Sequence, residues 1–257
     1  MLTIYPIHAF KDNYIWTIHN QQYAVVVDPG TATPVIEYLE LEKLQLCAIL
    51  ITHHHSDHTG GNQELLESFD VPAFGPRNEF IPSITHPVRE GDQINLHEIS
   101  LNFTVLDTPG HTQGHIAYYA SNPMNILFCG DTLFSCGCGR IFEGSPQQMY
   151  QSLQKLSRLP DDTLIYCTHE YTLSNIRFAR TVDPENSKLA ELEIAARKLR
   201  NNIIPTLPTT LMLEKAVNPF LRCDQQEIID HVKNKTKQSL TDPASIFTAL
   251  REWKNSY

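Results

Sequence analysis

The stretch Thr52-His53-His54-His55-Ser56-Asp57-His58 determines how the rest of this chain is interpreted. It places four histidines and one carboxylate within seven residues. The apolar run at residues 47–52 predicts a short buried strand before it, and the spacing of apolar residues after Asn62 predicts a helix. The histidines therefore lie on a strand-to-helix loop, where a rigid scaffold can direct side chains toward one point.

The spacing within this loop predicts a metal site. Side chains two residues apart in an extended segment project on the same side, so His53 and His55 can share one ion. Asp57 and His58 follow where the chain turns into the helix and can serve a second ion nearby. Imidazole and carboxylate ligands without cysteine favour a catalytic site for zinc, iron or manganese. A solvated polar loop is the alternative, but it would crowd cationic imidazoles below pH ~6.5. His54 is expected to point away and receives no role.

Three later loops, each following a predicted strand, offer further ligands: His111, Asp131 and His169. Alone, each would be an ordinary surface residue, but together with the histidine loop they complete a set for two divalent ions. We expect one ion on His53, His55 and His111 and the other on Asp57, His58 and His169, with Asp131 bridging them. Asp57 and Asp131 are the predicted catalytic carboxylates. Two ions that share a carboxylate also share a water, which is acidified toward pKa ~7. His115 competes with His111 for its place, but it begins the next predicted strand.

Composition limits the class of protein. The chain has 257 residues, a hydrophobic content of 41% and a net charge of −9, which argues against a nucleic-acid surface. No apolar run approaches a membrane span, and no secretory signal is visible at the N-terminus. The six cysteines contain no Cys-x-x-Cys pair, which favours reduced thiols. We expect a cytoplasmic monomer with no membrane partner. Cys136 and Cys138 could bind metal, but a tight turn is the favoured interpretation.

The pattern of predicted secondary structure changes near residue 170. Up to that point short strands alternate with helices at residues 34–44 and 146–159, the first with Thr33 as its N-cap. After it we expect only helices, at residues 173–180, 187–202, 225–234 and 243–254. The sequence therefore predicts an α+β chain with a catalytic domain at residues 1–170 and a small all-α domain at residues 171–257.

Four motifs resemble those of the metallo-β-lactamase superfamily: Thr-His-x-His-x-Asp-His at residues 52–58, Pro-Gly-His-Thr at 109–112, Gly-Asp-Thr at 130–132, and the histidine of Thr-His-Glu at 168–170. The resemblance implies a four-layer αββα sandwich. It leaves the substrate open, because one fold hosts many activities.

Three further stretches are similar to the glyoxalase II family, the hydroxyacylglutathione hydrolases: residues 138–144 (Cys-Gly-Arg-Ile-Phe-Glu-Gly), 169–172 (His-Glu-Tyr-Thr) and 251–254 (Arg-Glu-Trp-Lys). This resemblance covers the whole chain. It implies hydrolysis of S-(2-hydroxyacyl)glutathione, chiefly S-D-lactoylglutathione, to D-lactate and glutathione by a metal-bridged hydroxide, with the helical domain contributing to glutathione binding.

Carried over residue by residue, the resemblance assigns substrate binding to Arg140, Tyr171, Arg251 and Lys254. Three cations on an acidic protein suit glutathione, which carries two carboxylates. Phe142 departs from family members that have tyrosine there, so a hydroxyl contact to glutathione is expected to be missing. Two roles are open for Asp28, as support for a metal-binding histidine or as an ordinary turn residue.

Other activities of the same fold compete with this interpretation. A persulfide dioxygenase would use one iron and would not need the helical domain. A lactonase or β-lactamase would not need a site for two carboxylates, and a nuclease would need a basic surface. A metal-binding protein without enzymatic activity would require an incomplete ligand set, whereas all seven predicted ligands are present in the sequence.

Overall fold

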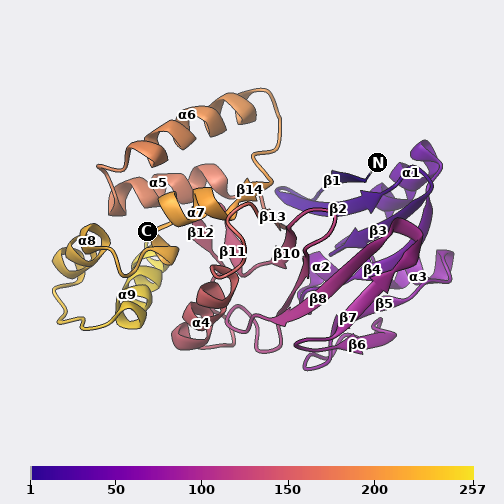
Figure 1. Ribbon diagram of the computed structural model, residues 1–257, viewed down its shortest axis with the longest axis horizontal. Helices are drawn as coiled ribbons and strands as arrows, with labels where there is room; N and C mark the ends of the chain where they lie inside the picture. The colour runs from indigo at the N-terminus through magenta and orange to yellow at the C-terminus, as the bar shows by residue number, and fades with distance from the viewer. Residues whose placement is uncertain (1) are drawn as a thin grey trace. The chain divides into compact units, whose positions relative to one another are not determined.

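The computed structural model describes residues 2–257 and divides the chain into two compact units. The first unit comprises residues up to Thr108 together with Thr112–Gly130, and the second comprises Pro109–His111 and Asp131–Tyr257. Figure 1 colours the chain from indigo to yellow, so the strands of the first unit are indigo to magenta and helices α5 to α9 are orange to yellow.

The first unit is built on a mixed sheet with strand order β1-β2-β3-β4-β5-β6. The first three strands are antiparallel and the pairings from β3 to β6 are parallel. Their bounds are Thr3–Ala9, Asn13–His19, Tyr23–Val27, Gln45–Leu50, Ala73–Pro76 and His86–Val88. Helix α1 (Thr33–Glu42) connects β3 to β4 and packs Val35 and Leu39 into the core of this unit. Parallel β4 therefore delivers the histidine loop at its carboxyl end.

Four more strands of the first unit run antiparallel in chain order: β7 (Gln93–Leu96), β8 (Leu101–Asp107), β9 (Ile116–Ala120) and β10 (Ile126–Gly130). The short helix η1 (His97–Ile99) lies between β7 and β8. The buried Tyr118 hydroxyl of β9 donates to the backbone oxygen of Ile51 at 2.6 Å. This bond ties the strands to the residue just after β4, beside the histidine loop.

The second unit is mostly helical. Its strands form two small pairs, β11 (Leu133–Phe134) with β12 (Gly137–Cys138) and β13 (Leu164–Cys167) with β14 (Thr209–Thr210). Capping boxes at Ser145 and Asp242 start α4 and α9, and both of these helices begin with proline. The helices are α4 (Pro146–Leu156), α5 (Thr172–Val182), α6 (Ser187–Asn201), α7 (Leu211–Val217), η2 (Pro219–Leu221), α8 (Gln226–Thr236) and α9 (Pro243–Asn255).

The α+β class predicted from the sequence is confirmed, with three local corrections. The prediction of Thr33 as an N-cap is wrong, because α1 already includes Thr33 and its N-cap is Ala32, with no side-chain bond. The prediction of helices alone after residue 170 missed β14, whose two residues pair with β13. It also missed α7. The division into domains at residue 170 stays a prediction. No helix within residues 2–257 combines the length and apolar character needed to cross a bilayer.

The histidine loop itself contains a short helix. Helix α2 (Ser56–Thr59) carries Asp57 and His58, and α3 (Asn62–Ser68) follows it. His53 lies at a bend of the backbone after β4, while His58 lies in the helical turn of α2. This change of conformation within six residues lets both imidazoles approach one another.

Candidate active site

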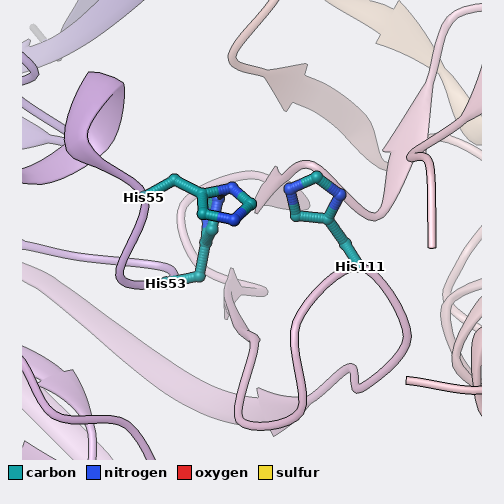
Figure 2. Close-up of side chains that lie close together, drawn as sticks. All are labelled: His53, His55 and His111. Carbon is teal, nitrogen blue, oxygen red and sulfur yellow. Dashed lines mark hydrogen bonds between the residues drawn. The ribbon is translucent and has the colours of Figure 1, made fainter. Parts of the chain in front are cut away.

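Histidines 53, 55 and 58 converge within the first unit. The Nε2 atom of His53 lies 3.1 Å from Nδ1 of His55, and their rings meet edge to face, as Figure 2 shows. The ring centroids of His53 and His58 are 4.1 Å apart. Two imidazole nitrogens at such a distance share either a proton or a cation, and neutral imidazole is the common ligand of zinc and iron. This geometry fits a metal ion.

Asp28 holds the histidine loop by hydrogen bonds to Thr52 and His58. Its carboxylate accepts the Thr52 backbone N–H at 2.8 Å, the Thr52 hydroxyl at 2.7 Å and the Nδ1 proton of His58 at 3.0 Å. Because a carboxylate can only accept, the proton of neutral His58 is on Nδ1, and Nε2 keeps its lone pair for a metal. Asp28 has φ 52° and is 1% exposed, so it is both the turn residue and the partner of His58.

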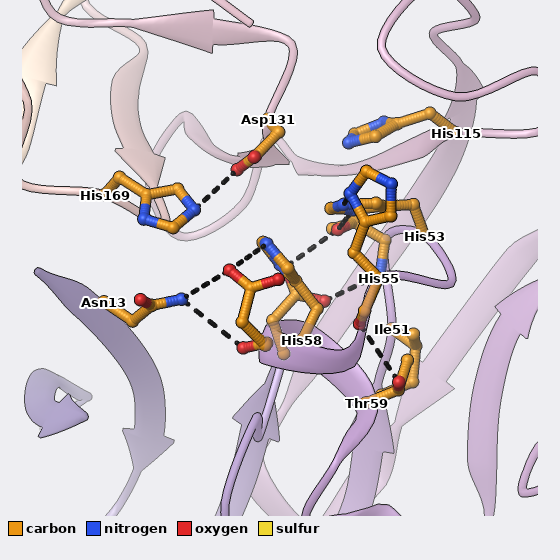
Figure 3. A network of polar contacts seen from close by, with 12 residues as sticks. Asn13, Ile51, His53, His55, His58, Thr59, His115, Asp131 and His169 are labelled. Atoms are coloured by element: carbon orange, nitrogen blue, oxygen red, sulfur yellow. Dashed lines mark hydrogen bonds and ion pairs between the residues drawn. The ribbon is translucent and has the colours of Figure 1, made fainter. Parts of the chain in front are cut away.

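Asp57 is oriented by a residue that the sequence analysis did not single out. The amide of Asn13, at the start of β2, donates to Asp57 Oδ2 at 3.0 Å and to the Asp57 backbone oxygen at 3.4 Å. Figure 3 shows both bonds. The Asp57 carboxylate is 40% exposed and lies 3.5 Å from Nε2 of His58. Asn13 thus holds one carboxylate oxygen of Asp57, while the carboxylate remains accessible to solvent.

Gly130 ends β10 in close contact with the base of the histidine loop. A Cβ at this glycine would lie 2.4 Å from Thr52 Oγ1 and 2.8 Å from His115 Nε2, and its φ is +46°. Only glycine permits this approach without displacing those atoms. The end of β10 is thus packed against Thr52, the residue that precedes His53 in the chain.

His115 is buried directly behind His53. Its ring stacks on His53 with centroids 4.7 Å apart at 25°, and its Nδ1 lies 2.9 Å from the Thr108 hydroxyl. The preference for His111 over His115 as a ligand stays a prediction, with His115 supporting the His53 ring by packing.

In the second unit one carboxylate faces two imidazoles. Asp131 Oδ2 lies 3.4 Å from His111 Nε2, and Asp131 Oδ1 lies 3.3 Å from His169 Nε2; the second contact is drawn in Figure 3. The Arg140 carbonyl accepts the Nδ1 proton of His111 at 2.7 Å, so the Nε2 atom that faces Asp131 carries the lone pair in the neutral ring. Each carboxylate oxygen of Asp131 thus faces a different imidazole, an arrangement that suits a carboxylate bridging two cations.

A cavity of about 380 Å³ opens beside His111 and Asp131 in the second unit. The rest of its lining mixes aromatic, cationic and small polar side chains: Phe134, Cys138, Arg140, Phe142, Tyr171, Ser174, Asn175, Arg251 and Lys254. The Tyr171 ring lies parallel to His169 with centroids 4.6 Å apart. The cavity can therefore hold a ligand with anionic groups next to a metal-binding end.

Lys254 is the most perturbed cation of this cavity. Burial, and next the charge of Arg251, lower its pKa to about 7. Its Nζ donates to the side-chain oxygen of Asn175 and lies 5.5 Å from the ring centroid of Phe220. The charge is therefore available at neutral pH for only part of the population, and an anionic ligand would favour the protonated form.

Residues 11–169 match the family model described as the metallo-beta-lactamase superfamily, and residues 170–257 match the model described as the hydroxyacylglutathione hydrolase C-terminus. The hydroxyacylglutathione hydrolase of Nitrosomonas eutropha is 57% identical over 257 residues, which is 100% of both chains. That of Vibrio campbellii is 52% identical over 260 residues, again 100% of both.

The chain belongs to the hydroxyacylglutathione hydrolase family. The crystal structure of ETHE1 from Myxococcus xanthus is similar as well, with a TM-score of 0.66 and 26% identity over 100% of this chain and 99% of the other. The family predicted from the motifs is confirmed, and so is its placement in the metallo-β-lactamase superfamily.

In this member of the family the four predicted substrate-binding residues line one cavity: Arg140, Tyr171, Arg251 and Lys254. Arg251 is only 5% exposed, and its Nη1 donates to the Cys138 carbonyl at 2.9 Å. It therefore also holds the cavity wall in place. Phe142 is 61% exposed with its ring edge-on to His111, and it supplies no hydroxyl.

The two cysteines considered as metal ligands belong to the β11–β12 hairpin. Cys136 occupies its turn with φ 57°, and Cys138 lies in β12. Burial raises the pKa of both thiols, which keeps them protonated and disfavours metal binding. Within residues 2–257 neither belongs to a cluster of metal-ligating side chains. The turn interpretation fits these facts.

Proposed function

We propose that this protein hydrolyses the thioester of S-(2-hydroxyacyl)glutathione, chiefly S-D-lactoylglutathione, to D-lactate and glutathione. One observation carries the proposal: a single cavity is lined both by the predicted metal ligands His111 and Asp131 and by three cationic residues, Arg140, Arg251 and Lys254. A thioester bound beside the metal ligands leaves the glutathione carboxylates for these cations. Relatives at 52–57% identity over the full chain carry the corresponding name, hydroxyacylglutathione hydrolase.

We propose that seven ligands hold two divalent ions. Zinc is the first candidate, with iron or manganese as alternatives, because imidazole and carboxylate discriminate little among them. The imidazole nitrogens 3.1 Å apart in the first unit and the carboxylate flanked by two imidazoles in the second support this assignment. One ion is assigned to His53, His55 and His111, the other to Asp57, His58 and His169, and Asp131 to both.

Metal ions held there would acidify a water and polarise the thioester carbonyl. The residues of the chain have defined parts in this reaction. Asp57, fixed at one oxygen by Asn13, is placed to accept a proton from the attacking water through its exposed carboxylate. Asp131 keeps His111 and His169 on opposite oxygens. The leaving thiol has a pKa near 8.5, so it departs as thiolate without a strong general acid.

The glutathione portion is assigned to Arg140, Tyr171, Arg251 and Lys254. An anionic ligand would favour the protonated form of Lys254, since its pKa of about 7 in the absence of ligand leaves it partly neutral. Arg251 acts from behind the wall, since its guanidinium already bonds the Cys138 backbone. Phe142 offers packing where tyrosine would offer a hydrogen bond.

We further propose that the protein works as a cytoplasmic monomer. Within residues 2–257 the cysteines form no disulfide, which suits a reducing compartment. Light scattering across protein concentrations measures the mass directly, and a mass of two chains at micromolar protein would contradict the monomer.

The substrate assignment is tested by steady-state kinetics of Lys254→Ala with S-D-lactoylglutathione. We expect KM to rise about tenfold or more with a smaller change in kcat, because the lost contact is to a part of the substrate that does not react. Lys188→Ala, an exposed lysine of α6, is the matched control and should leave both constants unchanged. Equal KM for wild type and Lys254→Ala would contradict glutathione binding in this cavity.

A further inference from the structure

The Glu79 carboxylate connects two loops that carry or flank predicted metal ligands. The side chain is 3% exposed. One oxygen, Oε2, lies 3.0 Å from Nδ1 of His54. The other, Oε1, accepts the Thr112 hydroxyl and the Gly114 backbone N–H, the latter at 3.1 Å. His54 thus has a partner of its own, although the sequence suggested no role for it.

The packing around Glu79 is as specific as its hydrogen bonds. A Cβ at Gly114 would lie 2.5 Å from Glu79 Cγ and 3.0 Å from the Asn78 backbone oxygen. The loop at residues 112–115 can approach Glu79 this closely only because residue 114 is glycine. Both its backbone and its threonine side chain are then fixed to a single carboxylate.

We propose that Glu79 is a positioning residue that fastens the loop of His53 and His55 to the loop that follows His111. The inference rests on the proposed function, because it assumes that these histidines hold metal. His54 lies between His53 and His55 in the chain, so bonding its ring to Oε2 restricts how the segment can rotate. Thr112 directly follows His111 in the chain, so the hydrogen bond from the Thr112 hydroxyl to Glu79 Oε1 restricts the loop that follows His111.

The chemistry of a carboxylate explains why glutamate suits this position. Its two oxygens accept hydrogen bonds on both sides, one toward each loop. Removing a buried acceptor leaves its donors unsatisfied, and partners behind metal ligands typically change metal affinity by 10–100-fold when they are lost. The effect should therefore appear in metal binding itself and not only in turnover.

The test compares the zinc affinity of full-length wild type, Glu79→Ala, Glu79→Gln and Glu37→Ala by competition with a chromophoric chelator. Glu37 is an exposed glutamate of α1 and serves as the matched control. We expect Glu79→Ala to lose about 10–100-fold in zinc affinity, and Glu37→Ala to lose none. Glu79→Gln should stay close to wild type, because its amide oxygen still accepts from Thr112 and Gly114 while its N–H₂ donates to neutral His54.

Wild-type zinc affinity in Glu79→Ala would overturn the proposal, and so would a loss in Glu79→Gln as large as that in Glu79→Ala. If Glu79→Ala does not fold, Thr112→Val decides, since it deletes one donor and keeps the shape. A loss of about threefold or more supports the proposal and an unchanged affinity overturns it. A wild-type protein that binds zinc but does not cleave the thioester would instead count against the proposed function alone.

Discussion

The substitution Asp28→Asn would disturb the histidine loop with almost no change in shape. Asp28 Oδ1 accepts the Thr52 backbone N–H, a bond that the asparagine oxygen can keep. Asp28 Oδ2 accepts both the Thr52 hydroxyl and the His58 Nδ1 proton, and an amide N–H₂ in its place can only donate. The proton of His58 must then move to Nε2, which removes the lone pair assigned to the metal.

The expected magnitude follows from these bonds. Two buried hydrogen bonds to a charged acceptor are lost, each worth about 1.5–3 kcal/mol. Rotation of the Thr52 hydroxyl recovers part of this, so we expect the metal-free protein to lose about 3 kcal/mol in its free energy of unfolding. For a chain of this length that lowers Tm by about 6–12 °C. Metal affinity should fall by about 10–100-fold, the usual effect of losing a partner behind a ligand.

Two measurements on purified Asp28→Asn check these values. Thermal unfolding of the metal-free protein reports the stability of the loop, and chelator competition reports metal affinity. Glu37→Gln, at an exposed position of α1, makes the same carboxylate-to-amide change and is a control that should alter neither. If Asp28→Asn binds zinc as tightly as wild type, the assignment of the His58 proton to Nδ1 by Asp28 is refuted.

Three other substitutions address separate parts of the account. Asn13→Ala frees Asp57, and we expect kcat to fall about tenfold; an unaltered kcat would contradict the orienting role. Because the pKa of Lys254 is about 7 in the folded protein and 10.5 unfolded, the unfolded chain binds more protons between these values. The free energy of unfolding should therefore rise with pH across that window, and guanidinium titrations at pH 7 and 9 should show a smaller rise in Lys254→Met. An equal rise would contradict the shift. Glu214→Ala leaves the Cys136 N–H and two side-chain donors without their buried acceptor. The free energy of unfolding from denaturant titrations should therefore fall by about 3 kcal/mol. A change below about 1 kcal/mol would contradict that role.

The sequence was most informative where short-range spacing controls geometry. His53 and His55 follow a strand, and His58 lies in a helical turn, so their convergence depends on only six residues. The strand-then-ligand pattern likewise placed Asp131 directly after β10. Full-length family motifs added the fold class, which the comparisons bear out.

Contacts between distant segments could not be predicted in this way. Glu79 is 25 residues from His54 and 33 from Thr112, and no local pattern links them. The bond between Lys254 and Asn175 spans 79 residues. These partners are set by packing, which no periodicity reports.

Short elements and exact helix ends were also not predictable from the sequence. Two residues of β14 cannot show an alternation, so Thr209–Thr210 gave no strand signal. Thr33 was assigned as an N-cap because threonine before proline is a common helix start. The backbone instead becomes helical at Ala32, which has φ −83° and ψ −41°.

The central claim is a metal-dependent thioesterase, and its most direct test is turnover of S-D-lactoylglutathione before and after metal removal. Wild-type protein would be assayed by loss of thioester absorbance when loaded with zinc, after chelation and dialysis, and after zinc is returned. The account predicts robust turnover, its loss on chelation and its recovery with zinc. Absence of turnover in zinc-loaded protein, or turnover that survives complete metal removal, would contradict it.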